Sequence, residues 1–309
     1  MKAWSCCPLL WLCFTARLFA QDWICLNDLT DPHVWTSPDF LAAWPHVAQD
    51  ANSAGLVRVS LRNPPTLLSL TVHSATARFV HGAVDSLSLV LLDGGDYFGY
   101  QNSNVKGESV PQARKEFDEQ FTQEKEKLEK FLQAIARRPP TTFQPGEHGA
   151  FRVKAQLFHL GGAWSRVLAV DHQLLMVDFF RTEQAARSLK AVPPPPAPQI
   201  NPFAPRVATG DQLIPEIPMI AQGNRGYCGA ATLAMIGEFL GLQPGAEEYA
   251  AFSGFQYGDI KSPDIRELCS RVAQEAGLHA ERSERFDFDR ARATIDAGLP
   301  VLAFRRWSP

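Results

Sequence analysis

One cysteine of this chain has the surroundings of a nucleophile. Cys228 lies between Gly226 and Gly229, at the start of an apolar segment, residues 230–240, whose composition predicts a helix. The first turn of a helix carries unpaired backbone N–H groups and about half a positive charge, and both stabilise a thiolate over a thiol. Glycines on both sides allow a tight turn and the close approach of a carbonyl group. We therefore interpret Cys228 as a nucleophile; the alternative is a small buried residue.

A glutamine six residues earlier could serve the same reaction. The carboxamide of Gln222 and the backbone N–H of Cys228 are both neutral donors that could point at one oxygen atom. Two such donors would form an oxyanion hole, which stabilises the charge on a carbonyl oxygen under attack. Chance spacing is the alternative explanation for this glutamine.

These residues give the last third of the chain, about residues 213–304, a resemblance to a known family. The pattern Pro-x-Ile-x-Gln-x5-Cys-Gly-Ala-Ala-Thr-Leu-Ala-Met resembles the papain-like cysteine peptidases, and within them the bacteriocin-processing type, peptidase family 39. The resemblance implies a hydrolase that cuts peptide bonds, with Cys228 as nucleophile and with Gln222 and Cys228 as the oxyanion hole. It implies a peptide or protein substrate, and we expect no cofactor and no metal.

The resemblance also implies a histidine base, followed by an aspartate or asparagine, after a strand expected at residues 299–304. The sequence ends at Pro309 before either residue, so we expect the base beyond this end and the peptidase domain to be an incomplete fragment. The one histidine after Cys228, His279, matches no position of the motif. An inactive peptide-binding module and a thiol acyltransferase therefore remain as alternatives.

Composition and targeting narrow the function classes. A formal net charge of -3 gives no basic surface for nucleic acid, so we expect no nucleic-acid partner. Residues 1–20 combine Lys2, an apolar run and a terminal Ala20, which predicts a signal peptide and a secreted or periplasmic protein. A short membrane anchor is the alternative, but we expect no stable span in the mature chain. Cleavage would leave three cysteines, Cys25, Cys228 and Cys269, of which Cys269 is expected to be a core residue.

The chain is predicted to have an α+β fold in two domains. Residues 21–190 are expected to form an accessory domain of unknown role, an N-terminal helix plus an antiparallel sheet, with no chemistry of its own. Residues 191–210 form a Pro-rich linker, and residues 211–309 are expected to form the helical lobe of a papain-like fold.

Several elements follow from periodicity. Residues 112–138 carry apolar side chains at helical spacing and predict the clearest helix, with a solvated charged face. Strand character is seen at residues 56–61, 67–72, 86–92, 151–157, 166–170 and 174–180, and the segments at 86–92 and 151–157 alternate as a half-buried strand does. The last three segments are expected to form an antiparallel meander with one face in water. We expect a turn at residues 93–96, whose two carboxylates are too few for calcium. In the last domain we expect helices at residues 247–252, 263–276 and 288–297, and a buried strand at residues 300–304.

Overall fold

The computed structural model of the chain describes residues 29–31, 33, 35, 46–51, 56–61, 66–67, 70–80, 83–98, 109–146, 151, 153–171, 173–190, 214, 217–223, 225–254 and 265–303. The predicted signal peptide, a helix expected to begin near Ser37, Cys25 and the Pro-rich segment lie outside these residues. Within them the fold is α+β, as predicted: an antiparallel sheet with a long helix, followed by a helical region.

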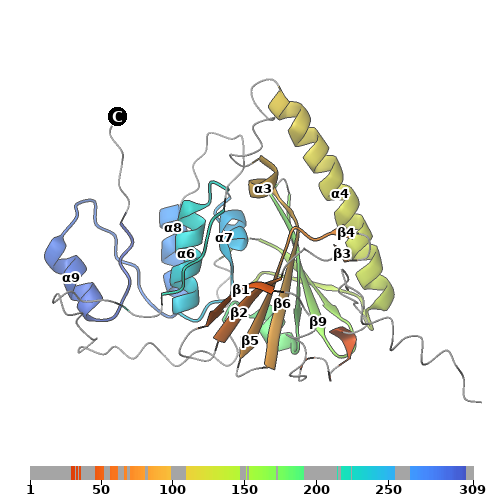
Figure 1. Ribbon diagram of the computed structural model, residues 1–309, viewed down its shortest axis with the longest axis horizontal. Coiled ribbons are helices and arrows are strands. Elements are labelled where there is room, and N and C mark those ends of the chain that lie inside the picture. Colours follow the sequence, from red (N-terminus) through yellow and green to blue (C-terminus); the bar gives the residue numbers. More distant parts are fainter. Residues whose placement is uncertain are drawn as a thin grey trace, which may run out of the picture.

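The described strands form one eight-stranded antiparallel sheet at the centre of the molecule, in the order β1-β2-β5-β6-β10-β9-β8-β7 (Figure 1). The strand expected at residues 67–72 is instead divided between two short strands that pair with each other, β3 (Thr66–Leu67) and β4 (Leu70–Thr71). The strand expected at residues 151–157 begins only at Ala155, and its earlier described residues, 151, 153 and 154, are not in a strand. The strands of the main sheet are β1 (His46–Ala51), β2 (Leu56–Leu61), β5 (Ser74–Val80), β6 (Ala83–Asp93), β7 (Thr141–Phe143), β8 (Ala155–His159), β9 (Trp164–Val170) and β10 (Leu174–Phe180).

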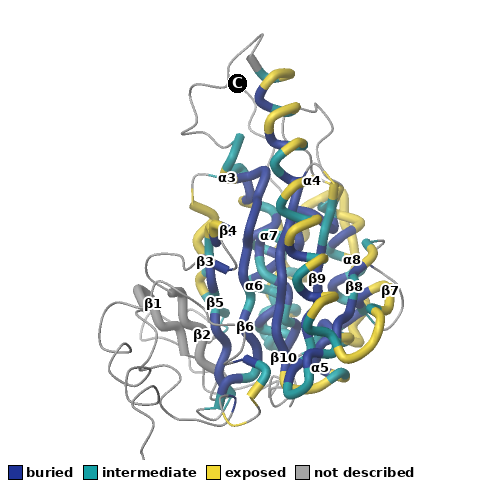
Figure 2. The backbone as a smooth tube through the Cα atoms, turned by 90° about the vertical axis from the view of Figure 1, so that its right-hand side faces the viewer, coloured by how far each residue is buried: buried dark blue, intermediate teal, exposed yellow. Residues whose placement is uncertain are grey.

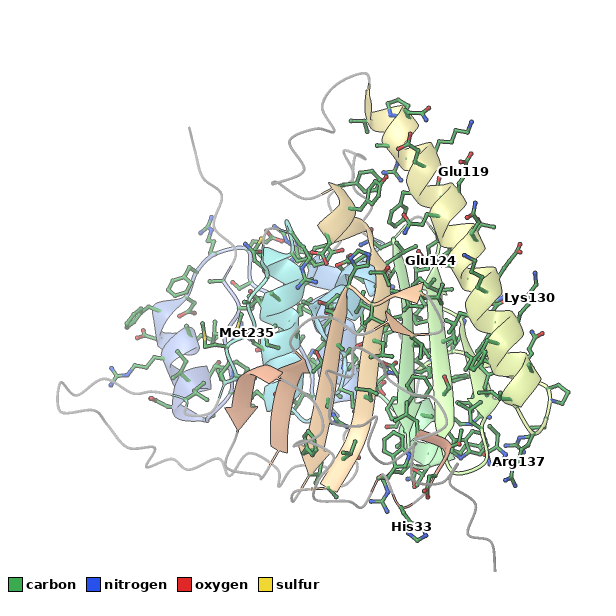
Figure 3. The ribbon with its side chains drawn as sticks, turned by 45° about the vertical axis from the view of Figure 1, so that its right-hand side comes forward. His33, Glu119, Glu124, Lys130, Arg137 and Met235 are labelled. Atoms are coloured by element: carbon green, nitrogen blue, oxygen red, sulfur yellow. The ribbon has the colours of Figure 1, made fainter. Side chains whose placement is uncertain are left out.

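One face of the sheet is covered by the long helix α4 (Ser109–Ile135), which confirms the helix predicted at residues 112–138 (Figure 1). Glu119 and Lys130 lie on its outer side, away from the strands (Figure 3), so the predicted solvated face is also confirmed. The apolar side chains that α4 buries against the sheet lie at helical spacing: Phe117, Phe121, Leu128 and Leu132.

The opposite face of the sheet is covered by three helices of the C-terminal region: α6 (Cys228–Phe239), α7 (Ala246–Phe252) and α8 (Ile265–Glu275). Their buried side chains share one apolar cluster with the sheet, where Leu233 and Tyr249 join Leu174 and Met176 of β10. The expectation of a water-facing side is therefore wrong for the middle of the sheet. All seven residues of β10 are buried (Figure 2), because helices cover both faces of the strand.

The structure ends in a less buried region. The helix α9 (Phe288–Asp296) forms where predicted, but none of its residues is buried. The buried strand expected at residues 300–304 is wrong for its described part, residues 300–303, which has no strand structure and leaves Val301 41% exposed. A strand needs a neighbour that satisfies its backbone groups, and the described part of the sheet provides none there.

No helix in the described ranges combines the length and the apolar character needed to cross a membrane. The predicted boundary between the two domains falls in the Pro-rich segment outside these ranges and stays a prediction. What the structure adds is that the regions on either side of it, the sheet and helices α6 to α8, share a core.

Candidate active site

Cys228 is the first residue of α6, and its side chain is exposed to solvent. The helix therefore begins where the sequence analysis placed it. Its end is also as predicted, because Gly241 follows with a φ of 83°, a left-handed conformation that favours glycine. Among the described cysteines none is paired with Cys228 in a disulfide. The thiol is thus available to a molecule from solution.

Gly229 has a packing role in the fold, and the substrate approach expected of it stays a prediction. It is a helical residue of α6, and a Cβ atom there would lie 3.1 Å from Cγ1 of Ile265 at the start of α8. That distance is shorter than almost all real contacts, so the glycine lets α8 approach α6 closely. Packing between these two helices explains Gly229, and the approach of a substrate is not needed to explain it.

The segment before the helix carries Gln222, whose side chain is exposed, as that of Cys228 is. Its backbone turns at Gly223, which has a φ of 64°. The backbone carbonyl of Gln222 accepts a hydrogen bond of 2.9 Å from Nε of Arg225. The two residues expected to form the oxyanion hole are therefore both accessible. Arg225, which lies between them in the sequence, holds the backbone of Gln222.

Arg225 joins this segment to three other elements. Its Nη1 contacts Oδ2 of Asp93 at 3.2 Å and also donates to Glu247 of α7. Its Nε lies 3.7 Å from Oδ1 of Asp96. Asp93 is the last residue of β6, and Asp96 lies in the short helix α3 (Gly94–Phe98) that follows it. The guanidinium is thus held by carboxylates of the sheet, of α3 and of α7, and only 13% of its side chain is exposed.

Tyr227, the residue directly before Cys228, is buried and anchored to the same end of the sheet. Its hydroxyl donates to Oδ1 of Asp93 at 2.5 Å and accepts from Nε2 of Gln173 at 2.6 Å and from the backbone N–H of Gly95 at 3.1 Å. A Cβ atom on Gly95 would lie 2.4 Å from Cζ of Tyr227, so only glycine leaves room for the ring. α3 lies at the end of the sheet beside α6 and α7 (Figure 1).

Burial and charge perturb the groups of this cluster. Burial, helped by the nearby charge of Glu247, raises the pKa of Asp93 to about 6, although Tyr227 and Arg225 oppose the shift. Burial also raises the pKa of Asp96 and, together with Asp93, that of Tyr227. For Arg225, burial lowers the pKa, but the carboxylate of Glu247 outweighs it and the pKa is raised. The arginine is therefore permanently charged, whereas Asp93 titrates near neutral pH.

The turn predicted at residues 93–96 is wrong. Asp93 ends a strand, Gly94 begins α3, and both aspartates of this segment face Arg225. The arginine is 132 residues away from Asp93 in the chain, so no local pattern could reveal the contact. The available signal was a pair of carboxylates directly after a long apolar strand.

Other candidates from the sequence do not join this cluster. His279 is exposed after the end of α8, and Cys269 is half-buried on α8, where it packs against the core as predicted. Within the ranges that the structure describes, no group of three or more metal-ligating side chains is suitably placed to hold an ion. Arg225 itself serves as the cation among the carboxylates.

Comparison of the chain with protein-family models, with curated proteins and with solved structures found no match.

Proposed function

We propose that this protein is an exported cysteine peptidase whose nucleophile is the thiolate of Cys228. The observation that carries the proposal is the exposed thiol at the first residue of α6, directly after Tyr227, whose hydroxyl is held by a buried hydrogen bond to Asp93. A nucleophile must be accessible and yet fixed, and this cysteine combines both properties. Helices α6 to α8 would then be the helical lobe of a papain-like fold, and residues 1–20 would direct the chain to export.

The proposed reaction is acyl transfer through a thioester. The sulfur of Cys228 attacks the peptide carbonyl, a C–S bond forms, and the oxygen takes the electron pair of the C=O double bond. The carboxamide of Gln222 and the backbone N–H of Cys228 stabilise this oxyanion. The C–N bond then breaks, and the amine leaves with a proton from the base histidine. Water attacks the thioester, the C–S bond breaks, and the acid and the thiolate are released.

The direction of the helix supports this role for Cys228. α6 has 12 residues, and its positive end lies at the cysteine. In the first turn, the backbone N–H groups have no partner within the helix and can turn toward an anion. The base histidine is implied by the resemblance alone, and we assign it to no residue of this chain.

A peptidyl electrophile tests the proposal without knowledge of the substrate. Benzyloxycarbonyl-phenylalanyl-alanyl chloromethyl ketone places a ketone at the position of the scissile carbonyl, so its reaction uses the oxyanion hole. We expect one adduct, mapped to Cys228 by peptide mass spectrometry, and none in Cys228→Ala. Gln222→Ala should slow the reaction by about tenfold to a hundredfold, since a lost oxyanion donor costs about this much or more.

The same experiment separates the alternatives. A thiol acyltransferase would form the same thioether adduct, so a peptide ester is added as a substrate: such an enzyme would transfer the acyl group from its thioester to an added amine faster than to water. An inactive binding module would hold the peptide without a covalent bond. A modification rate that is equal in the wild-type chain and in Gln222→Ala would contradict the oxyanion hole, and modification of Cys269 instead of Cys228 would contradict the nucleophile.

A further inference from the structure

Arg225 uses its nitrogen atoms for two purposes. Nε donates to the backbone carbonyl of Gln222 at 2.9 Å, and Nη1 contacts the carboxylates of Asp93 and Glu247. One side of the guanidinium thus binds the segment that carries the proposed oxyanion donor. Another side binds the end of β6 and the first turn of α7.

The contact between Arg225 and Asp93 of the sheet is held in place because Asp93 is buried. The side chain of Asp93 is fully buried, and its second oxygen, Oδ1, accepts from the hydroxyl of Tyr227 and from the backbone N–H of Gly95 at 2.8 Å. Asp93 pairs with Leu174 at the start of β10, so it lies at the end of two central strands. A carboxylate with these partners cannot move without breaking several buried hydrogen bonds.

In the sequence, the two anchors, Arg225 and Tyr227, lie between the two proposed site residues. Gln222 is held through Arg225, and Cys228 follows directly after the buried Tyr227, and both anchors meet at Asp93. One carboxylate of the sheet therefore connects the backbone at Gln222, through Arg225, to the residue directly before Cys228. The sheet was expected to be an accessory domain without chemistry, whereas this geometry makes it the support of the site.

We infer that Arg225 is a positioning residue of the proposed active site, which aims Gln222 by joining its backbone carbonyl to the carboxylates of Asp93 and Glu247. The inference rests on the proposed function, because it concerns the oxyanion hole. It adds a residue from outside the Gln-Cys pair, and it assigns a role in the reaction to β6 and α7.

Lysine could not replace this arginine. A guanidinium is a planar fork whose separate N–H groups point in fixed, different directions, whereas an ammonium is a compact charge at the end of a flexible chain. Arg225→Lys would keep a positive charge near Asp93 and Glu247 but would lose the fixed bond to Gln222. The substitution therefore separates positioning from charge.

Two reagents distinguish positioning from simple reactivity of the thiol. Iodoacetamide is attacked at a saturated carbon and needs only a thiolate, whereas the peptidyl chloromethyl ketone also develops an oxyanion. We expect Arg225→Lys to lower the rate with the ketone by about tenfold to a hundredfold, since a displacement of about 1 Å in an active site costs about this much. The rate with iodoacetamide should change by less than about threefold, because it depends on the thiolate alone.

The chain offers a matched control. Arg78 in β5 is also buried and pairs with Asp85 at the opposite end of β6 from Asp93. The quantity compared is the rate with the ketone divided by the rate with iodoacetamide. Arg78→Lys should leave this ratio within about twofold of the wild-type ratio, because the substitution perturbs a buried ion pair without touching the oxyanion hole. Background from other cysteines is subtracted with Cys228→Ala. If Arg225→Lys does not fold by circular dichroism, Glu247→Gln replaces it, and the same fall in the ratio is expected.

Each result has a distinct meaning. A lower ratio in Gln222→Ala and Arg225→Lys, but not in Arg78→Lys, supports the inference. An unchanged ratio in Arg225→Lys together with a lower one in Gln222→Ala overturns the positioning role and leaves the proposed function standing. An equal loss in Arg78→Lys also overturns the role, since general weakening of the fold then explains it. An unchanged ratio in Gln222→Ala contradicts the oxyanion hole and with it the positioning role, whereas the nucleophile is contradicted only if Cys228 is not the residue modified.

Discussion

At the scale of single residues, Asp93 has the most unusual environment in the site. It is fully buried, next to Glu247 and Asp96 as well as Arg225, and burial raises its pKa to about 6. Glu248 is in a similar position beside Arg166, where burial and the charge of Asp178 raise its pKa to about 7. A carboxyl group that binds its proton more tightly in the folded state stabilises the fold at acidic pH.

These two groups predict how stability depends on pH. Their contribution is fully present below the pKa values of the unfolded chain, near 4, and it is lost as the pH rises through about 6 for Asp93 and about 7 for Glu248. We expect the free energy of unfolding, from urea titrations, to be larger at about pH 5 than at about pH 8, by roughly 1–3 kcal/mol for each group. Asp93→Asn and Glu248→Gln should each reduce this difference; a double variant that keeps the whole difference would contradict the assignment.

The residues of the site differ in how far the sequence revealed them. Cys228 and Gln222 could be proposed from the sequence because their spacing and the neighbouring glycines lie within a few positions of each other. Arg225 and Tyr227 lie inside the same motif, but their partner Asp93 is more than 130 residues away. A contact of this kind depends on the fold as a whole, so local patterns could not predict it.

At the scale of elements, a second buried ion cluster connects the sheet to α7. Arg166 of β9 contacts Asp178 of β10 at 2.8 Å and Glu248 of α7 at 3.4 Å, and all three side chains are at most 7% exposed. Its guanidinium also lies 4.9 Å from the ring centroid of Phe180, and Glu248 accepts from the backbone N–H of Gly245 at the start of α7. These contacts fix the helix that carries Glu247, and so they support the Arg225 cluster indirectly.

The energy of this second cluster can be tested with one substitution. Arg166→Met should destabilise the protein by about 3–5 kcal/mol, because it leaves two carboxylates buried without their counter-ion. Arg282→Ala removes an exposed ion pair with Glu284 and should cost less than about 1 kcal/mol. Urea unfolding of both variants gives the comparison, and similar small losses would show that the buried cluster contributes little.

Elements with a periodic pattern were predictable, but their surroundings were not. The apolar residues of α4 recur at helical spacing from Phe117 to Leu132, so both the helix and its solvated face followed from the sequence. β10 was expected to have a water-facing side because antiparallel sheets often do. Its second face is covered by helices that begin only at Cys228, and the signal available within the strand was its near-continuous apolar run, Leu-Leu-Met-Val-Asp-Phe-Phe.

At the scale of the whole molecule, the sheet has α4 on one face and helices α6 to α8 on the other. Each helical layer buries its apolar side chains against the sheet. The cluster under α4 contains Leu89, and the cluster under α6 contains Leu233. Because adjacent strands supply side chains to both clusters, neither layer can be lost without exposing the sheet. The expected division into an accessory domain and a peptidase domain would instead produce two units that unfold separately.

This architecture predicts a single unfolding transition for the described fold. Leu89→Ala and Leu233→Ala should each lower the free energy of unfolding by about 2–5 kcal/mol, the usual cost of a cavity in a core. In both variants, urea curves from tryptophan fluorescence and from far-ultraviolet circular dichroism should coincide and shift together. Two separate transitions, with each variant moving only one of them, would support independent domains.

The most direct test of the account compares two aspartates of the same strand, Asp93 and Asp85. Both are paired with an arginine, but only Asp93 contacts the segment that leads to Cys228. We predict that Asp93→Ala slows the modification of Cys228 by the peptidyl chloromethyl ketone by about tenfold or more, relative to its modification by iodoacetamide, while Asp85→Ala does not. Equal ratios in both variants and in the wild-type chain would contradict the claim that the sheet positions the nucleophile and its oxyanion hole.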